Sequence, residues 1–257
     1  MAAQKKAEPT EIAITSPSQY AICKIVPGDM KSIMRENLGD EPISAFDLER
    51  VKFPAGGNTI WKMQTASGNK NVEEICGVIV FWNPCRAMWT EAFTGKGVPP
   101  DCKSIDAVVG IGVGVSEDNP RGLCNEKFCP MARFESADNG IGQACKAMRQ
   151  LFLIRETGIL PLVITLPPTS IDVCKKYFMS LLSEQTPYYG VVTRFTLTEA
   201  HSRQGIAYSK VQMEAIHTLS QTEIASMRAY QESMRTSFSH VETFDDAMDG
   251  VAENPVQ

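Results

Sequence analysis

The eight cysteines are the residues of this chain with the clearest potential for chemistry. Four of them, Cys102, Cys124, Cys129 and Cys145, lie within or at the border of a segment, residues 83–139, that is rich in Gly, Pro and Asp and lacks a regular apolar pattern. Four residues separate Cys124 from Cys129, Cys102 lies 22 positions before Cys124, and Cys145 lies 16 positions after Cys129. Structural zinc sites take four thiolate or imidazole ligands, and a loop this long needs something other than apolar burial to order it. We therefore expect one structural Zn²⁺ on these four thiols, with small buried apolar thiols as the alternative.

The other four cysteines have different surroundings. Cys23, Cys76 and Cys174 stand among aliphatic or helix-face residues and are expected to be buried thiols, whereas Cys85 is the substitute ligand if one of the four is wrong. The chain has no run of eighteen apolar residues and its first ten residues do not resemble a signal peptide. We therefore expect a soluble protein of the reducing cytoplasm, in which thiols or metal ligation replace disulfides. Four thiolates close the coordination shell, so the zinc would staple the loop and would not activate water.

Catalytic patterns are sparse. None of the three histidines stands beside a nucleophile motif, and Gly110-Ile-Gly-Val-Gly114 has no following Lys-Ser/Thr, so a flexible turn is favoured over a phosphate loop. Asp101 and Asp106 near the cysteines are the only carboxylates suited to a metal-dependent nuclease, and residues of this type more often cap loops. The sequence therefore favours a protein that is not an enzyme.

Aromatic and cationic residues alternate in several short stretches, as single-stranded nucleic-acid binding requires. Flat rings stack on bases and contribute about 1–3 kcal/mol per base, while Lys and Arg contact the backbone. Some rings must instead fill the core, and Phe81, Phe152 and Phe178 are expected there. The nucleic-acid-binding candidates are Trp61, Lys62, Trp82, Arg86, Trp89, Lys146, Arg149, Tyr189, Arg194, Phe195, Tyr208 and Lys210.

Charge is unevenly distributed. The formal net charge is −5, but residues 238–257 carry five acids and no Lys or Arg, so removing that segment leaves residues 1–237 neutral. Such an acidic tail can occupy a basic groove or recruit partners. The alternative is a disordered, solubilising terminus.

The coarse pattern of elements predicts a mainly β protein with helices, of the α+β class. A short arm, residues 1–18, precedes one domain, residues 19–237, whose zinc-binding insertion spans about residues 83–145; the acidic tail follows. Sequential strands favour an antiparallel sheet or barrel over a doubly wound sheet. Helices are predicted at residues 28–38, 142–156, 171–182 and 222–234, and strands at two places within 46–63 and at 75–82, 160–166, 188–198 and 206–216.

The motif order between Pro99 and Tyr208 resembles a family of single-stranded DNA-binding proteins of phages and mobile elements. The resemblance rests on residues 99–106, 124–130 and 142–154, and further on 160–161, 166–170 and 189–195. It implies an OB-like antiparallel barrel with a zinc-stapled loop and peripheral helices. Two positions depart from the family pattern: Ala107 stands where a Gly is expected after Asp106, and Gln143 where a Lys is usual.

The resemblance implies a protein that coats single-stranded DNA during replication or recombination in the cytoplasm of a bacterial host. The acidic tail would recruit replication or recombination proteins. No membrane partner is expected, and the protein could form a homo-oligomer. Two rivals are retained: a zinc-stabilised protein-interaction or regulatory module, and a metal-dependent nuclease.

Overall fold

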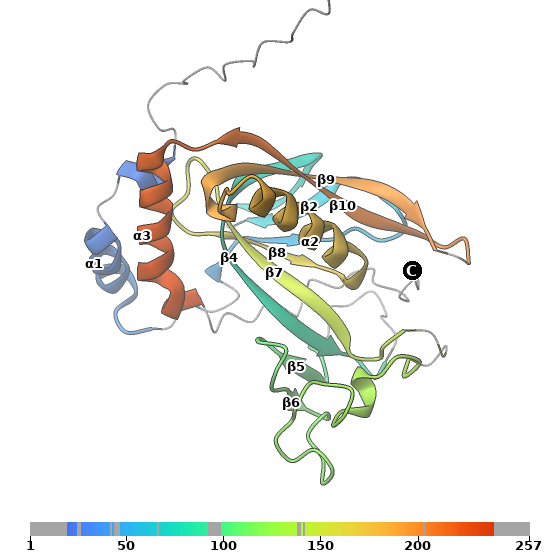
Figure 1. Ribbon diagram of the computed structural model, residues 1–257. Coiled ribbons are helices and arrows are strands. Elements are labelled where there is room, and N and C mark those ends of the chain that lie inside the picture. Colours follow the sequence, from blue (N-terminus) through green and yellow to red (C-terminus); the bar gives the residue numbers. More distant parts are fainter. Residues whose placement is uncertain are drawn as a thin grey trace, which may run out of the picture.

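A curled, mainly antiparallel sheet forms the body of the protein in a computed structural model (Figure 1). The structure describes residues 20–24, 27–41, 43, 47–65, 67–91, 99–137, 140, 142–202 and 204–238. Eight strands follow the order β10-β9-β4-β7-β8-β1-β2-β3, while β5 and β6 branch from β4; of the described pairs, only β1–β8 is parallel. The strands are β1 (Arg50–Lys52), β2 (Trp61–Thr65), β3 (Gly68–Val72), β4 (Glu74–Met88), β5 (Cys102–Ser104), β6 (Ile111–Gly112), β7 (Lys146–Ile154), β8 (Leu162–Leu166), β9 (Val191–His201) and β10 (Ala207–Thr218).

Helices cover both faces of this sheet. Neighbouring residues of a strand point to opposite faces, and apolar side chains of the central strands are buried on each face. Val78 of β4 belongs to a core cluster with Tyr230 of α3 (Gln221–Phe238), and α1 (Pro27–Leu38) contacts α3. The next residue, Ile79, belongs to the other cluster, together with Cys174 of α2 (Pro168–Ser183). The sheet is thus a central layer with α2 on one side and α1 and α3 on the other (Figure 1).

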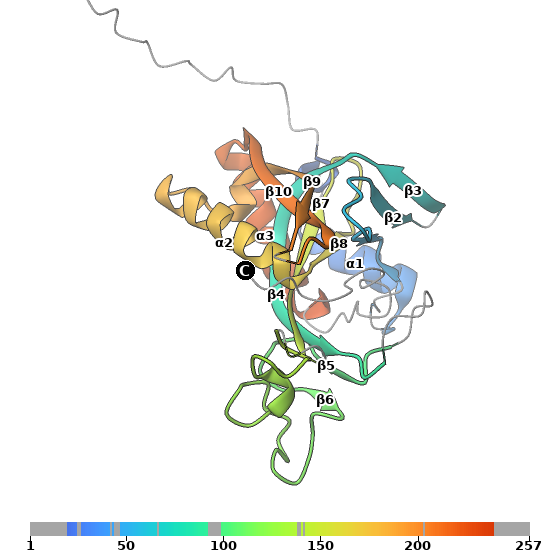
Figure 2. The ribbon, with the colours of Figure 1, turned by 90° about the vertical axis from the view of Figure 1, so that its right-hand side faces the viewer.

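The sheet curls far enough for distant strands to meet. The β4 strand runs as one long arc through the molecule (Figure 2). The Ser209 hydroxyl of β10 lies 2.7 Å from the carbonyl oxygen of Asn58 and 2.9 Å from that of Pro54, both in the turn between β1 and β2. The expected α+β, barrel-like architecture is therefore present, as a curled open sheet.

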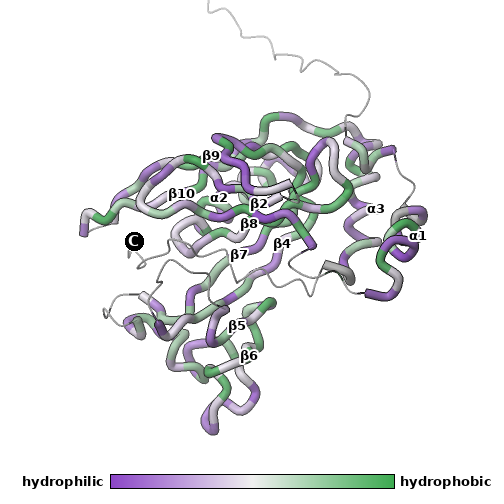
Figure 3. Tube along the Cα trace, turned by 180° about the vertical axis from the view of Figure 1, so that it is seen from behind, coloured by the Kyte–Doolittle hydropathy of each residue, from purple (hydrophilic) through white to green (hydrophobic). Residues whose placement is uncertain are grey.

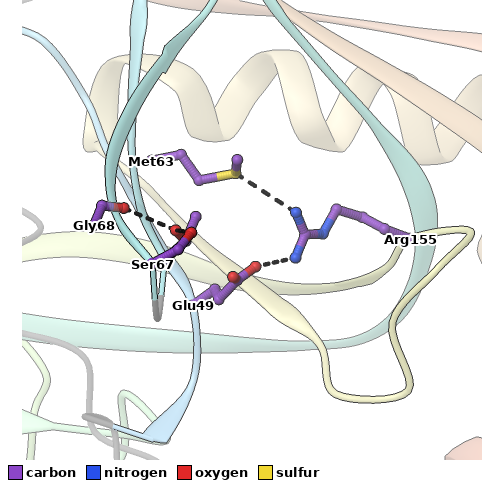
Figure 4. Close-up of polar contacts among 6 residues, drawn as sticks. Glu49, Met63, Ser67, Gly68 and Arg155 are labelled. Atoms are coloured by element: carbon purple, nitrogen blue, oxygen red, sulfur yellow. Dashed lines mark hydrogen bonds and ion pairs between the residues drawn. The ribbon is translucent and has the colours of Figure 1, made fainter.

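An ion pair joins the two segments that border β8. Glu49 directly precedes β1, Arg155 directly follows β7, and their side chains form an ion pair although each is only about 30 % exposed (Figure 4). A second guanidinium nitrogen of Arg155 lies 3.8 Å from the Met63 sulfur in β2. Arg155 therefore connects β7 to both β1 and β2.

Most predicted elements are confirmed, with one clear error. The helices expected at residues 28–38, 171–182 and 222–234 match α1, α2 and α3, and each predicted strand has a counterpart. The helix expected at residues 142–156 is wrong, because this segment contains β7. A central strand buried on both faces has a continuous apolar run, which periodicity alone cannot distinguish from a buried helix.

The insertion between β4 and β7 forms a separate lobe below the sheet, at the far ends of these two strands (Figures 1 and 2). It carries β5, β6 and a single 3₁₀ turn, η3 (Pro130–Ala132). Hydrophilic and hydrophobic residues alternate along its trace (Figure 3). Among the described residues, Met88, Cys102 and Cys145 form a buried cluster with Ala144 against them, and Cys129 and Ala132 are also buried. The cysteines therefore occupy the place that a hydrophobic core would normally fill.

The ends of the chain are outside this description. The predicted arm, residues 1–18, and all of the predicted acidic tail except Phe238 lie outside the described residues. No helix in the described part is long and apolar enough to cross a membrane.

Candidate metal centre and aromatic surface

The four predicted cysteines line one small pocket of the lobe. Cys102 lies on β5, Cys124 in the following loop, Cys129 directly before η3 and Cys145 directly before β7. The volume of this cavity is about 10 Å³, which is room for a single small occupant. The four cysteines, separated by up to 43 positions in the chain, thus line the same pocket. The rest of the lining consists of Met88, Gly114, Gly122, Leu123 and Met131.

Backbone hydrogen bonds hold the four cysteines in place. Cys102 stands between Met88 of β4 and Gly112 of β6 in the ladder. The Cys145 N–H donates to the Met131 carbonyl at 2.8 Å, which ties the entry of β7 to η3. The Cys124 N–H donates to Val108 and the Cys129 N–H to Asn125, both at 2.9 Å. Each ligand candidate is therefore fixed by a different part of the lobe.

Glycines allow the chain to close around the sulfurs. A Cβ on Gly114 would lie 2.8 Å from the Cys102 sulfur, and a Cβ on Gly110 would lie 3.1 Å from the Cys124 sulfur. At Gly112, where φ is 123°, a Cβ would meet the Asp101 carbonyl oxygen at 2.0 Å. The Gly110–Gly114 stretch is therefore not merely a flexible turn, as predicted, but a wall of the thiol pocket. The alternating glycines between Cys102 and Cys124 were the signal for this role.

Burial and nearby donors act in opposite directions on the thiols. Burial raises the pKa of Cys102, Cys124 and Cys145, the last to about 11. The Gly114 backbone lowers the pKa of Cys102 and the positive charge of Arg86 lowers that of Cys145, so each partly offsets burial. Donors and positive charge aimed at sulfur favour the thiolate, which is the form that binds metal.

The donor set fits zinc better than it fits a hard cation. Sulfur ligands select zinc and other soft metals, and four of them match a closed structural site. As the side chains stand, the described residues contain no group of three or more His, Cys, Asp or Glu that could hold a metal. Coordination therefore requires the thiols to turn toward the pocket centre.

The two carboxylates considered for a nuclease serve the loop. One Asp101 oxygen accepts hydrogen bonds at 2.7 Å from both the N–H and the hydroxyl of Thr90, and these bonds lower its pKa. One Asp106 oxygen accepts from the Val108 and Val109 N–H groups at 2.8 and 3.0 Å. Both arrangements are those of loop-capping residues.

A second feature lies on the sheet beyond the lobe, where aromatic rings from three elements meet. Trp82 of β4 is 36 % exposed, and its ring centroid lies 6.0 Å from that of Phe178 on α2. The Phe178 ring lies 5.6 Å from Tyr188, at the start of η4 (Tyr188–Gly190). The Arg149 guanidinium of β7 lies 4.5 Å from the Trp82 centroid. We call Trp82, Arg149, Phe178 and Tyr188 the Trp82 surface.

Three of the predicted nucleic-acid-binding residues belong to this surface or touch it: Trp82, Arg149 and Tyr189, whose ring lies 5.4 Å from Tyr188. Phe178 was expected in the core but is only half-buried. Tyr188 stands in one of the alternating aromatic and cationic stretches, although it is not among the binding candidates named above. The sequence could not reveal this group because α2 brings Phe178 to β4 only in the folded chain.

Two predicted stacking residues have no exposed ring. Trp61 and Phe195 are both 0 % exposed in the core cluster on the α2 side of the sheet. Each occupies an inward position of its strand, where alternation directs a large ring to the core. As folded, neither offers a face to a nucleic acid.

The remaining candidates are dispersed. Arg194 pairs with Glu214 at 2.7 Å and lies 3.9 Å from Glu74, so acids already balance its charge. Arg86 donates to the Cys145 carbonyl at 3.5 Å and so lies beside one of the pocket cysteines. Lys62 is exposed, whereas Trp89, Lys146, Tyr208 and Lys210 are half-buried.

The expectation of buried thiols holds for Cys174 but only in part for two others. Cys174 is 0 % exposed in the core, whereas Cys23 and Cys76 are half-buried and pack against the other core cluster. Cys85 is buried with Ala87 and Met148, and burial raises its pKa to about 12. Cys85 does not line the thiol pocket.

Comparison with known proteins gives no match: no family model, no curated protein and no solved structure is similar enough to be identified with this chain.

Proposed function

We propose that this protein binds single-stranded DNA at the Trp82 surface, with one structural zinc ordering the adjacent lobe. The observation that carries the proposal is the guanidinium of Arg149 stacked on a partly exposed Trp82, with two further rings beside it. Single-stranded nucleic acids are bound by rings that stack on bases and cations that contact phosphates. The motif resemblance points the same way and suggests a role in phage or mobile-element replication or recombination.

The OB-like relationship and the tail's role are parts of the same proposal. A curled sheet whose β1–β2 turn reaches β10 supports an OB-like ancestry. The acidic segment beyond Phe238 would compete for the cationic surface or recruit replication or recombination proteins. Deleting residues 239–257 should then strengthen DNA binding.

A titration of labelled oligo-dT followed by fluorescence anisotropy tests the proposal. Wild-type protein should bind at low salt with micromolar or lower Kd and more weakly at higher salt. Trp82→Ala should raise the Kd about tenfold to hundredfold, because a stacked ring is lost. Phe134→Ala is the matched control, since this lobe ring is 68 % exposed and lies outside the Trp82 surface. Equal Kd values for the Trp82 variant and wild type, or no binding at low salt, would reject the proposal.

A second function, as a protein-interaction module, is favoured by the lobe. Val109, Ile111, Val113 and Val115 are each between 44 % and 68 % exposed, as is Phe134. Exposed apolar groups gathered on one small unit often mark an interaction surface. The absence of oligo-dT binding in the titration would favour this second function.

A further inference from the structure

Arg86 occupies a special position on β4. Its register partners are Ser104 of β5 on one side and Ala147 of β7 on the other. The first strand carries Cys102, and the second begins directly after Cys145. Two ladders therefore fix the backbone of Arg86 beside the strands that deliver two of the four thiols.

The side chain of Arg86 reaches Cys145. One guanidinium nitrogen lies 3.5 Å from the Cys145 carbonyl oxygen, and the side chain is half-buried. The positive charge of this guanidinium also opposes the rise that burial causes in the pKa of the Cys145 and Cys124 thiols.

A zinc site with four thiolate ligands is stabilised by a nearby cation. Four thiolates and one Zn²⁺ carry a formal charge of −2, and a net charge in a partly buried pocket is costly unless a partner offsets it. Groups that hydrogen-bond to metal ligands orient them and tune the affinity of the site, typically by 10–100-fold. A guanidinium supplies both a permanent positive charge and several N–H donors.

We infer that Arg86 is a positioning residue of the metal centre, which orients Cys145 and offsets the charge of the thiolates, and is not a nucleic-acid contact. The inference rests on the proposed zinc site and revises the role expected for Arg86 from the sequence. It also connects the lobe to the Trp82 surface, because Arg86 and Trp82 lie four residues apart on the same strand.

Zinc affinity measured by competition with a chromophoric chelator tests the inference. Arg86→Met should raise the Kd for Zn²⁺ about 10–100-fold, and Arg86→Lys should raise it less because the charge remains. Arg121→Met is the matched control, since Arg121 is an exposed cation of the same lobe; its Kd should remain within about twofold of wild type. A wild-type Kd for Arg86→Met would overturn the inference, whereas failure of wild-type protein to bind zinc would overturn the metal centre itself.

Two further measurements separate the alternatives. Circular dichroism shows whether Arg86→Met folds. If it does not, the Zn²⁺ affinity of Arg86→Lys tests the inference instead, and a wild-type Kd for Arg86→Lys would contradict the need for a guanidinium. The salt dependence of oligo-dT binding is then measured at saturating zinc. If Arg86 contacted phosphate, Arg86→Met would reduce the slope of log Kd against log salt by about one; we expect an unchanged slope.

Discussion

Ala107 has a backbone conformation that is unusual for a residue with a side chain. Its φ is 58°, in the left-handed region that disfavours any residue with a Cβ. A Gly was expected at this position, and a Gly would adopt this conformation without strain. The Asp106 carboxylate accepts N–H groups from both Val108 and Val109, which holds the turn in this conformation despite the Cβ.

Ala107→Gly should therefore stabilise the lobe by about 0.5–1 kcal/mol, because relief of left-handed strain exceeds the added freedom of the unfolded chain. Native-state hydrogen exchange of residues 104–110 in zinc-loaded protein would show slower exchange. Ala55→Gly is the control: Ala55 is exposed in the β1–β2 turn and is not among the described residues with positive φ, so its replacement should speed local exchange. Faster exchange in Ala107→Gly would contradict the strain argument.

At the scale of elements, the lobe depends on close backbone approach more than on apolar packing. Its short strands β5 and β6 cannot form a core alone, and the Gly110–Gly114 wall brings the backbone to the sulfurs. Zinc binding in such a unit supplies the folding free energy that a core would otherwise give. The glycines are thus as necessary to the proposed site as the ligands.

Gly114→Ala should weaken zinc binding by at least about tenfold, because the added Cβ would lie 2.8 Å from the Cys102 sulfur and displace a ligand. Gly158→Ala is a suitable control, since its Cβ would meet nothing nearer than a carbonyl oxygen at 3.5 Å. Chelator competition and the zinc content of purified protein measure the effect. Unchanged zinc content and Kd for Gly114→Ala would show that the sulfurs are not held as described.

For the whole molecule, the two parts differ in what stabilises them. The sheet buries apolar residues on both faces under α2 and α3, whereas the described part of the lobe buries few apolar groups besides its cysteines. Regions with few buried apolar contacts open at low free energy. The lobe and the sheet should therefore respond differently to loss of metal.

Removal of zinc by a chelator should raise hydrogen exchange across residues 99–137 while β9, β10 and α2 remain protected. The ends of β4 and β7 should show an intermediate response, because Met88 and Cys145 contact the pocket. Cys124→Ser should reproduce the pattern without chelator, and Cys85→Ser should not. A uniform rise over the whole chain would contradict an independent lobe.

The sequence by itself determined most elements and the four cysteines that share a pocket. Apolar periodicity, Pro167-Pro168 at the start of α2 and short apolar runs of strand length are local signals, so they can be recognised without the fold. The segment without apolar pattern likewise marked the lobe. These features depend on residues close together in the chain.

Only the tertiary structure decided which face each ring and cation takes. Trp61 and Phe195 point inward, Phe178 reaches Trp82 through α2, and β7 is a strand because β4 and β8 pair with it. Arg86 lies against Cys145, 59 positions away in the chain. Such contacts depend on pairing between distant segments, and period-two alternation in a strand does not state which face will meet a helix. The sequence therefore predicted the four cysteines as a group, whereas the roles proposed for the neighbouring glycines and for Arg86 could be inferred only from the tertiary structure.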